Sequence, residues 1–387
     1  MPPYVLMLCS WYPGRADALS GDFVQRHARA LATQMRVITV FAGKYAINNR
    51  AGILVEKAET NNLTEYRCYY PPRLFLGSMR AQWDYLVSIR RVLKEVLSTY
   101  GPPTLVHIQV GWKGAIWAWY LRHFYRQWPQ VVTEHSTEYH ANATLNIRNQ
   151  PWMRQYLTRT LFKHTRLWMP VSAHLGDTLA QYFGLQKPVC VVPNTVDTSL
   201  FYPAPPASAL VPFRVLHVST FTTQKNPEAL LRIFTRLLAL KMEVWIIGTE
   251  SELLYKWYNN LTTNLKEQVK CLGYCTYMQV ADAMRQCHSL LLFSRYENLP
   301  CVILEAFCCG LPVVSTRVGG IAEVVNEQNG VLVADGDEDG AVQALAQMAA
   351  GDLHFDNQQI ARQAQKLYSY AAIGRQIMDG YAQTGLI

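Results

Sequence analysis

The stretch Ser294-Arg-Tyr-Glu-Asn-Leu-Pro-Cys-Val-Ile-Leu-Glu-Ala-Phe-Cys-Cys-Gly310 decides how the second half of the chain folds. The apolar run 290–293 before it is typical of a buried parallel strand. Pro300 suits the first position of a helix, and Gly310 followed by Pro312 ends that helix. The sequence therefore predicts a strand, a loop and a helix in direct succession, as in a parallel α/β sheet.

Two carboxylates in this stretch mark a candidate ligand site. Glu297 belongs to the loop, and Glu305 is the only charged residue between Leu299 and Thr316. A single carboxylate on an apolar helix is rarely buried without a partner. The N-terminus of the helix adds backbone N–H groups that favour an anion. We therefore expect a polyol that carries phosphate to bind here. The alternative is a solvated loop carboxylate and an ordinary helix ion pair.

The spacing Glu297-x7-Glu305 resembles the two-glutamate signature of the retaining glycosyltransferases of family 4. The resemblance implies that Glu297 lies beside the donor sugar and that Glu305 binds the ribose hydroxyls of a nucleotide. It also implies a GT-B fold, in which two doubly wound, Rossmann-like α/β domains face a central cleft. The donor, a nucleotide-diphosphate sugar, would bind mainly to the second domain and would need no metal.

Two positions in the first half fit the same family. Gly21 matches a glycine that lets backbone N–H groups approach the diphosphate, with Gly14 as the competing position. His135 follows the predicted strand 130–133 and matches a histidine that approaches the donor sugar. The resemblance gives His135 a positioning role rather than that of a base, because the acceptor proton leaves toward the departing phosphate. Its neighbours Glu134 and Glu138 would orient it or pair with a nearby basic helix.

The second half adds a cation for the diphosphate. Lys225 matches a lysine that neutralises the diphosphate, but Thr220 stands where the family carries an arginine. Either Lys225 acts with the helix N-terminus alone, or Arg295 replaces the missing arginine. The catalytic set is then His135, Glu297 and Lys225, and the donor-binding set is Gly21, Thr220, Lys225, Asn298, Leu299, Cys301 and Glu305.

The length of 387 residues favours two α/β domains of similar size. We place the first, acceptor-binding domain at residues 1–197 and a proline-rich linker at 198–212. The nucleotide-sugar-binding domain then covers residues 213–368. A closing helix within 369–387 is expected to pack back on the first domain, as the resemblance implies. Residues 44–80 are expected to form loops and short strands. These either form part of the acceptor-binding side or simply cover the apolar core.

Composition points to a cytoplasmic protein. Half of the residues are apolar, yet no run reaches the roughly 18 apolar residues of a membrane span, and no secretory signal is evident. The nine cysteines include no Cys-x-x-Cys pair, so the sequence predicts reduced thiols rather than a zinc site or a disulfide framework.

The net charge of +8 is unevenly distributed. Residues 1–200 carry 22 Lys and Arg against 11 Asp and Glu, whereas the rest carries 14 against 17. A basic first half indicates an anionic partner, either a phosphorylated acceptor or an anionic membrane surface on which the protein would be peripheral. Nucleic acid is disfavoured, because no recognition motif is present. The candidate membrane contacts lie on one predicted helix: Arg80, Arg90, Arg91 and Lys94.

The acidic segment 335–340 admits two metal-binding interpretations. As a calcium loop it fails, because Ala346 stands where a bidentate glutamate is required. As the Asp-x-Asp motif of metal-dependent transferases, Asp335 and Asp337 lie after a strand that family 4 places away from the donor. A helix from Glu338 with Asp337 as its N-cap explains the segment better, so no metal is expected.

The sequence thus predicts transfer of a sugar from a nucleotide-diphosphate sugar to a saccharide or lipid-linked acceptor, in the synthesis of cell-surface polysaccharide or glycoconjugate. Two alternatives stay open. One is a non-hydrolysing sugar-nucleotide epimerase of similar architecture. The other is a catalytically silent subunit that binds nucleotide or scaffolds a partner, which the missing arginine near Thr220 favours.

Overall fold

The computed structural model describes residues 2–45, 53–71, 77–203, 212–249 and 251–386, without the side chains of residues 77–82. These residues form two compact units. The first comprises the chain up to Tyr139, Leu145–Thr195 and the segment from Tyr370, and the second comprises His140–Thr144 and Val196–Ser369. Most of the predicted linker, including Pro205 and Pro206, lies outside the described residues.

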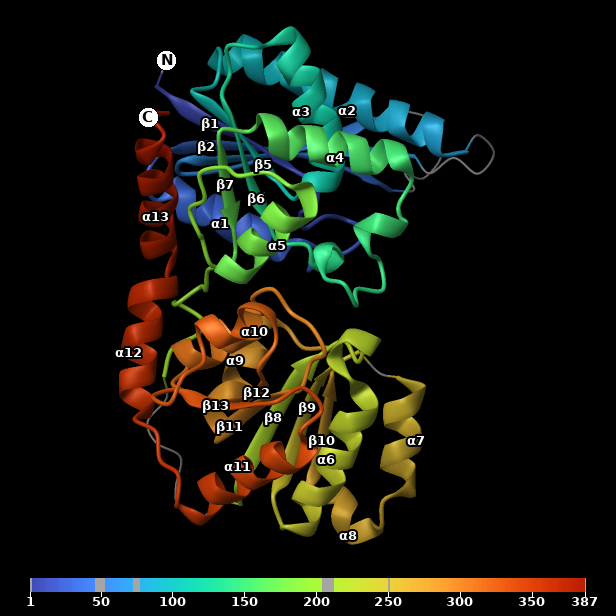
Figure 1. The fold of residues 1–387 in the computed structure, drawn as a ribbon, viewed down its shortest axis with the longest axis vertical. Coiled ribbons are helices and arrows are strands. Elements are labelled where there is room, and N and C mark those ends of the chain that lie inside the picture. The colour runs from blue at the N-terminus through green and yellow to red at the C-terminus, as the bar shows by residue number, and fades with distance from the viewer. Residues whose placement is uncertain (1, 46–52, 72–76, 204–211, 250, 387) are drawn as a thin grey trace. The chain divides into compact units, whose positions relative to one another are not determined.

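The first unit is built on a seven-stranded sheet with the order β3-β4-β2-β1-β5-β6-β7 (Figure 1). All neighbours are parallel except β3, which pairs antiparallel with β4. Residues 54–70 therefore form a regular hairpin at the edge of the sheet. The strands are β1 (Tyr4–Cys9), β2 (Arg36–Lys44), β3 (Leu54–Thr60), β4 (Leu63–Tyr70), β5 (Leu105–Gln109), β6 (Gln130–Glu134) and β7 (Leu167–Pro170).

Helices cover both faces of this sheet, because the strand side chains are apolar on both faces. Val5, Met7 and Cys9 of β1 pack with residues of α1 and α13 in one core cluster. The alternate residues of β1 point to the opposite face, where Figure 1 shows α2, α3 and α4. The helices are α1 (Asp22–Ala32), α2 (Gly77–Tyr100), α3 (Gly111–Phe124), α4 (Trp152–His164), α5 (Ala173–Phe183) and α13 (Tyr370–Gln383).

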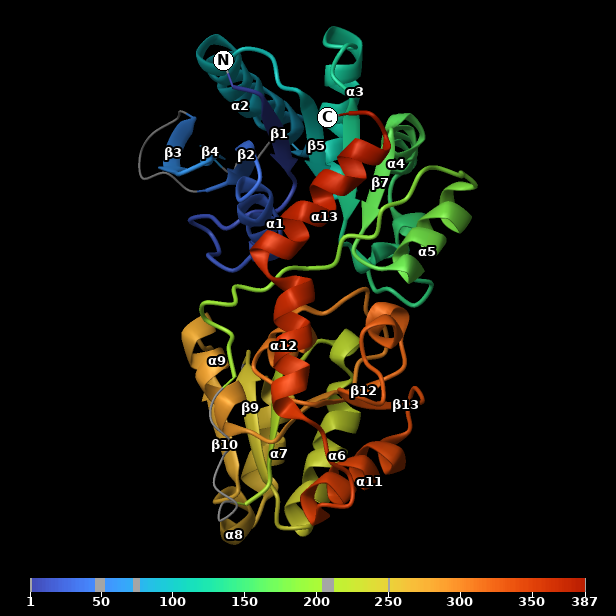
Figure 2. The same ribbon diagram turned by 90° about the vertical axis from the view of Figure 1, so that its left-hand side faces the viewer.

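The closing helix α13 lies along α1 in both ribbon views (Figures 1 and 2). Gly374 makes this close packing possible, because a Cβ there would lie 2.2 Å from the Ala30 carbonyl oxygen. The buried side chains Ile373, Ile377 and Tyr381 then join the core of the first unit. The last helix of the chain is thus part of the unit that the N-terminus begins.

The second unit is built on a six-stranded, fully parallel sheet with the order β10-β9-β8-β11-β12-β13. The strands are β8 (Arg214–Ser219), β9 (Glu243–Gly248), β10 (Val269–Gly273), β11 (Ser289–Leu292), β12 (Val313–Thr316) and β13 (Gly330–Val333). The helices are α6 (Pro227–Ala239), α7 (Glu252–Asn260), α8 (Thr263–Lys266), α9 (Tyr277–Gln286), α10 (Cys301–Cys308), α11 (Glu338–Ala350) and α12 (Asn357–Tyr368).

The acidic segment 335–340 serves helix α11. The Asp337 carboxylate accepts a hydrogen bond from the Gly340 backbone N–H at 2.8 Å, so the predicted N-cap is confirmed. Glu338 and Asp339 lie in the first turn, where negative charge is favourable.

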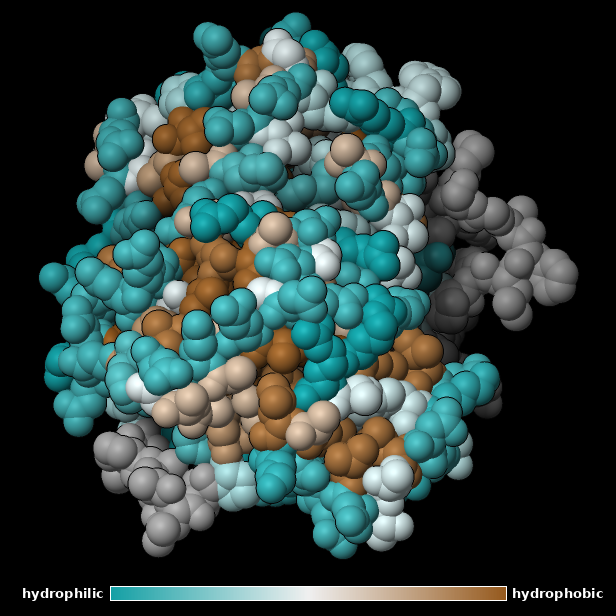
Figure 3. Space-filling view, turned by 60° about the horizontal axis from the view of Figure 1, so that its bottom comes forward, coloured by the Kyte–Doolittle hydropathy of each residue, from teal (hydrophilic) through white to brown (hydrophobic). Residues whose placement is uncertain are grey.

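No helix within the described residues is long and apolar enough to cross a membrane. The face drawn in Figure 3 is mainly hydrophilic, with hydrophobic residues in small groups between the polar ones.

Candidate functional site

Each sheet reverses its strand order once, and open α/β sheets bind ligands at such a point, beyond the carboxyl ends of the strands. In the second unit, β8 lies between β9 and β11, so the reversal falls between β8 and β11. In the first unit it falls between β1 and β5. Of five non-glycine residues with positive φ in the described part of the chain, three lie between one of these strands and the α-helix that follows it: Val110, Phe221 and Asn226. Strained backbone of this kind often accompanies function.

Lys225 and Glu297 come from the two loops that diverge at the reversal point of the second unit. The Lys225 Nζ atom lies 2.5 Å from Glu297 Oε1, and the Gln224 amide donates to Glu297 Oε2 at 3.0 Å. The Glu297 carboxylate is buried, with a relative exposure of 5%. The structure therefore brings together the predicted sugar-side carboxylate and the predicted diphosphate cation.

The loop that carries Glu297 is fixed by its backbone. Thr316 Oγ1 donates to the Ser294 carbonyl at 2.7 Å, and the Gly320 N–H donates to the Asn298 carbonyl at 2.8 Å. Gly319 has φ +53°, and a Cβ there would lie 1.7 Å from the Glu297 carbonyl oxygen. Only glycine fits at that position, so the glycine pair after β12 holds Glu297 and Asn298 in place.

His140 is a site residue that the sequence did not reveal. Its Nε2 atom lies 2.6 Å from Asn298 Oδ1, and its ring lies 5.9 Å from the Tyr296 ring. Gln224 was missed in the same way. Both contacts join residues more than 70 positions apart, and neither residue stands in a local motif that could have indicated it.

Helix α10 begins one residue later than expected. Pro300 is its N-cap, with φ −70° and ψ 126°, and Cys301 is the first helical residue. Leu299 is buried just before the cap. Glu305 is also buried, at 4% exposure, within the apolar helix. The cavity of about 280 Å³ lined by Phe213, His288 and Pro312 is a different feature, because these residues precede strands and lie at the opposite edge of the sheet.

Thr220 is exposed directly after β8, and no cation stands at its position. Arg295 lies close by in the described structure, because its backbone N–H donates to the Gln224 carbonyl and its guanidinium donates to Asn226 Oδ1 at 3.0 Å. The Arg295 side chain is therefore held beside the residue that follows Lys225.

In the first unit, Gly21 precedes helix α1 with φ +74°. A Cβ at Gly21 would lie 2.5 Å from the backbone of Trp11 and Tyr12, whereas Gly14 has no positive φ. Of the two predicted positions, only Gly21 has a backbone that requires glycine.

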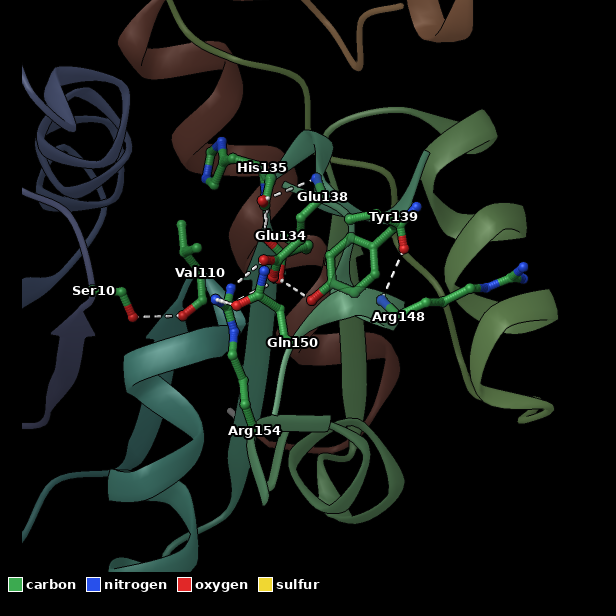
Figure 4. Close-up of polar contacts among 12 residues, drawn as sticks. Ser10, Val110, Glu134, His135, Glu138, Tyr139, Arg148, Gln150 and Arg154 are labelled. Carbon is green, nitrogen blue, oxygen red and sulfur yellow. Dashed lines mark hydrogen bonds and ion pairs between the residues drawn. The ribbon is translucent and has the colours of Figure 1, made fainter. Parts of the chain in front are cut away.

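Glu134 holds the end of β6 together. It accepts hydrogen bonds from the backbone N–H groups of Gly111, His135 and Ser136 at 2.8–2.9 Å and from the Tyr139 hydroxyl at 3.1 Å (Figure 4). Burial raises the pKa of this carboxyl, and the N–H donors oppose the rise. Because Glu134 fixes the loop backbone rather than the ring of His135, its role is to shape the site.

Glu138 pairs with Arg154 of helix α4, and pairing with a nearby basic helix was one of the two roles predicted for it. The Arg154 guanidinium also lies 4.5 Å from the centre of the Trp112 ring. Burial and the nearby Glu134 raise the pKa of Glu138 to about 7, and Arg154 opposes the rise.

His135 lies in a buried polar network. Its Nε2 atom lies 3.2 Å from Gln109 Oε1, and its Nδ1 atom lies 3.1 Å from Asn194 Oδ1. Gln109 continues the network to His107, whose Nδ1 atom lies 2.5 Å from the Tyr381 hydroxyl of α13. Burial lowers the pKa of His135 well below its usual value, and the nearby His27 lowers it further. His135 is therefore neutral at ordinary pH, and its ring can donate a hydrogen bond to only one of the two amide oxygens.

Among the residues that the structure describes, no group of three or more His, Cys, Asp or Glu could hold a metal ion.

The sequence matches two known families, one in each half. Residues 21–200 match the family described as Glycosyltransferase Family 4, and residues 212–350 match Glycosyl transferases group 1. The chain belongs to glycosyltransferase family 4. The predicted family is thereby confirmed.

A curated relative of this family 4 glycosyltransferase comes from Arabidopsis thaliana. It is one of the subunits of phosphatidylinositol N-acetylglucosaminyltransferase, and it is 26% identical over 189 residues. That match covers 48% of this chain and 42% of the relative, so the chain spans less than half of the length of that protein.

Solved structures cover nearly the whole chain. A sucrose-phosphate synthase from Thermosynechococcus elongatus has a TM-score of 0.77 at 19% identity and covers 98% of both chains. Anabaena HepE, solved in complex with UDP, has a TM-score of 0.69 at 16% identity and covers 98% of this chain and 100% of that one. These likenesses confirm the predicted GT-B fold class.

The buried histidines of the first unit predict a loss of stability in acid. Burial lowers the pKa of His107 from 6.5 to about 3, so below about pH 6.5 the unfolded chain binds a proton that the folded chain does not. The free energy of unfolding should fall as pH falls, by about 1.4 kcal/mol per pH unit for this histidine. His107→Gln should remove that part of the slope, as measured by urea unfolding at several pH values between about 4 and 6.5.

The exposed His123→Gln is the matched control and should keep the slope of the unmodified protein. An equal slope in His107→Gln and the unmodified protein would contradict this account.

Proposed function

We propose that this family 4 glycosyltransferase is retaining and metal-independent, and that it uses a nucleotide-diphosphate sugar. The contact between Lys225 and Glu297 at the reversal point of the second sheet carries the proposal. A cation for a diphosphate and a carboxylate for a sugar are the two charges that such a donor requires, and they arise here from separate loops at the edge where α/β sheets bind ligands.

The donor-binding roles follow from the chemistry of each group. Lys225 binds the diphosphate. Arg295 is the second cation and replaces the family arginine, at whose position this chain has Thr220. The N–H groups of Leu299 and Cys301 add donors before and at the start of α10. Glu305 accepts hydrogen bonds from the ribose hydroxyls, and Gly21 allows backbone N–H groups of the first unit to approach the diphosphate.

The reaction breaks the bond between the anomeric carbon and the diphosphate oxygen. Positive charge develops on the sugar while negative charge develops on the leaving diphosphate, which Lys225 stabilises. The acceptor hydroxyl attacks from the face that the diphosphate leaves and gives its proton to the departing phosphate oxygen. Glu297 and Asn298 orient the sugar, and the neutral His135 positions it. The products are the glycoside with retained configuration and the nucleotide diphosphate.

The acceptor is a saccharide or a lipid-linked compound, in the synthesis of cell-surface polysaccharide or glycoconjugate. The name of the Arabidopsis relative includes the lipid phosphatidylinositol, which supports a lipid-linked acceptor. The basic first half supports reversible docking of the first unit on an anionic cytoplasmic membrane surface. Arg90, Arg91 and Lys94 are exposed on α2, whereas the side chain of Arg80 lies outside the described residues.

A catalytically silent subunit is the second candidate, because Thr220 replaces the family arginine. Incubation with a panel of nucleotide sugars and candidate acceptors separates these functions. We expect release of nucleotide diphosphate and, with an acceptor, a product whose anomeric configuration matches that of the donor by NMR. Epimerised sugar would instead indicate an epimerase, binding without turnover would indicate the silent protein, and an inverted product would overturn the retaining mechanism.

Glu305→Ala should weaken the binding of nucleotide diphosphate by about 1–3 kcal/mol, the scale of a hydrogen bond to a charged group. Glu305→Gln should lose less, because it keeps an acceptor for one ribose hydroxyl. Calorimetric titration with UDP and GDP measures both effects. Unchanged affinity in a folded Glu305→Ala protein would remove Glu305 from the donor site.

Turnover of the donor should survive thorough chelation, because Lys225 and the N-terminus of α10 supply the positive potential. The same nucleotide-release assay, run with EDTA, measures this. Loss of activity with EDTA and rescue by Mg²⁺ or Mn²⁺ would return Asp335 and Asp337 to consideration, and Asp335→Asn would then be the first variant to examine.

A further inference from the structure

The helices on one face of the first sheet carry an unusual set of exposed side chains. Helix α4 presents Trp152 and Tyr156 with relative exposures of 77% and 58%. Arg159 and Lys163 are exposed on the same helix. The four positions are separated by four, three and four residues, so they form one stripe along the helix. Isolated exposed aromatic residues are ordinary, but an aligned stripe of this composition is not.

Helix α2 repeats the pattern. Trp83 and Val87 have relative exposures of 65% and 38%, and Arg90 and Lys94 are exposed at the spacings found in α4. Helix α3, which lies with α2 and α4 on this face of the sheet, exposes Phe124 by 66% and Trp119 by 43% (Figure 1). Each of the three helices on this face of the sheet therefore exposes an aromatic ring, and α2 and α4 also expose cations.

Helices α3 and α4 carry charges of one sign, whereas α2 adds the exposed Glu95 beside Lys94. From residue 96 to residue 176 the chain contains eight Lys and Arg but only two carboxylates, Glu134 and Glu138. Both carboxylates are buried at the end of β6. Arg159 and Lys163 form no ion pair within the described part of the chain. Such a surface is complementary to an extended anionic partner rather than to a protein with mixed charges.

We propose that the outer surface of α2, α3 and α4 is a docking face for an anionic lipid bilayer. Indole and phenol rings favour the boundary between headgroups and acyl chains, because one part of each ring system is apolar and another is polar. Trp152, Tyr156, Trp83 and Phe124 enter this boundary, while Arg159 and Lys163 contact lipid phosphates. The proposal builds on the docking of the first unit proposed above and extends it from the cations of α2 to an aromatic and basic face.

Flotation with vesicles of phosphatidylcholine, with or without phosphatidylglycerol, tests the face. We expect the full chain to bind only the anionic vesicles and to dissociate as salt rises. Trp152→Ser with Tyr156→Ser should weaken binding at every salt concentration. Arg159→Gln with Lys163→Gln should weaken it roughly tenfold to thirtyfold at low salt and flatten the salt dependence, since each cation near such a surface contributes about a fivefold factor. Arg90→Glu with Arg91→Glu should also weaken it.

Insertion of the rings has its own signal. Brominated lipids should quench tryptophan emission of the bound protein, and Trp152→Ser should reduce the quenched fraction. The matched control is Tyr255→Ser with Lys256→Gln on α7 of the second unit, where Tyr255 is 68% exposed. This control should bind vesicles like the unmodified protein.

Binding of UDP and donor hydrolysis are measured on the same variants and should be unchanged, because none of these residues belongs to the proposed donor site. Failure of the unmodified protein to bind any nucleotide diphosphate would reject the proposed function. The vesicle experiment would still decide whether the face docks on a bilayer. No binding to anionic vesicles at low salt, self-association in place of vesicle binding, or binding that only the α7 variant weakens would each overturn the docking face.

Discussion

The contact between Lys225 and Glu297 joins the loops that follow β8 and β11, at the point where the strand order of the second sheet reverses. Both side chains are largely buried, with 17% and 6% of their side-chain surface exposed. A pair of this kind gains little net stability, because the loss of hydration offsets the attraction, but removal of one partner leaves a buried charge. The pair is therefore better suited to a ligand site than to the stability of the core. The diphosphate proposed to bind Lys225 would compete with Glu297 for the same ammonium group.

The fold could be predicted from the sequence because its signals are local. Short apolar strands followed by helices with recognisable caps determine a parallel α/β unit, and the strand–loop–helix order around Pro300 was predicted, with the helix start displaced by one residue. The contact between Lys225 and Glu297 could be predicted only through the family resemblance. The contacts of His140 and Gln224 could not be predicted, because they depend on how loops from distant parts of the chain fold onto each other.

Thr220 departs from the family pattern, and Arg295 is the residue proposed to compensate for it. The sequence shows a missing cation after β8, and Arg295 as the candidate replacement. The structure adds a physical reason for that choice, since the Arg295 guanidinium is held by Asn226, next to Lys225. A cation supplied from the β11 loop would approach the diphosphate from another direction than a cation supplied from the β8 loop.

The network around His135 bears on how a neutral histidine serves a transferase. Both ring nitrogens of His135 lie within 3.2 Å of side-chain amide oxygens, and a neutral imidazole can donate a hydrogen bond to only one of them. For the ring to take a proton from an acceptor it would have to carry charge in a site where burial and His27 oppose it. A positioning role does not require that charge. In the mechanism proposed above the acceptor proton goes to the departing phosphate, so a neutral His135 is compatible with transfer on the face of the leaving group.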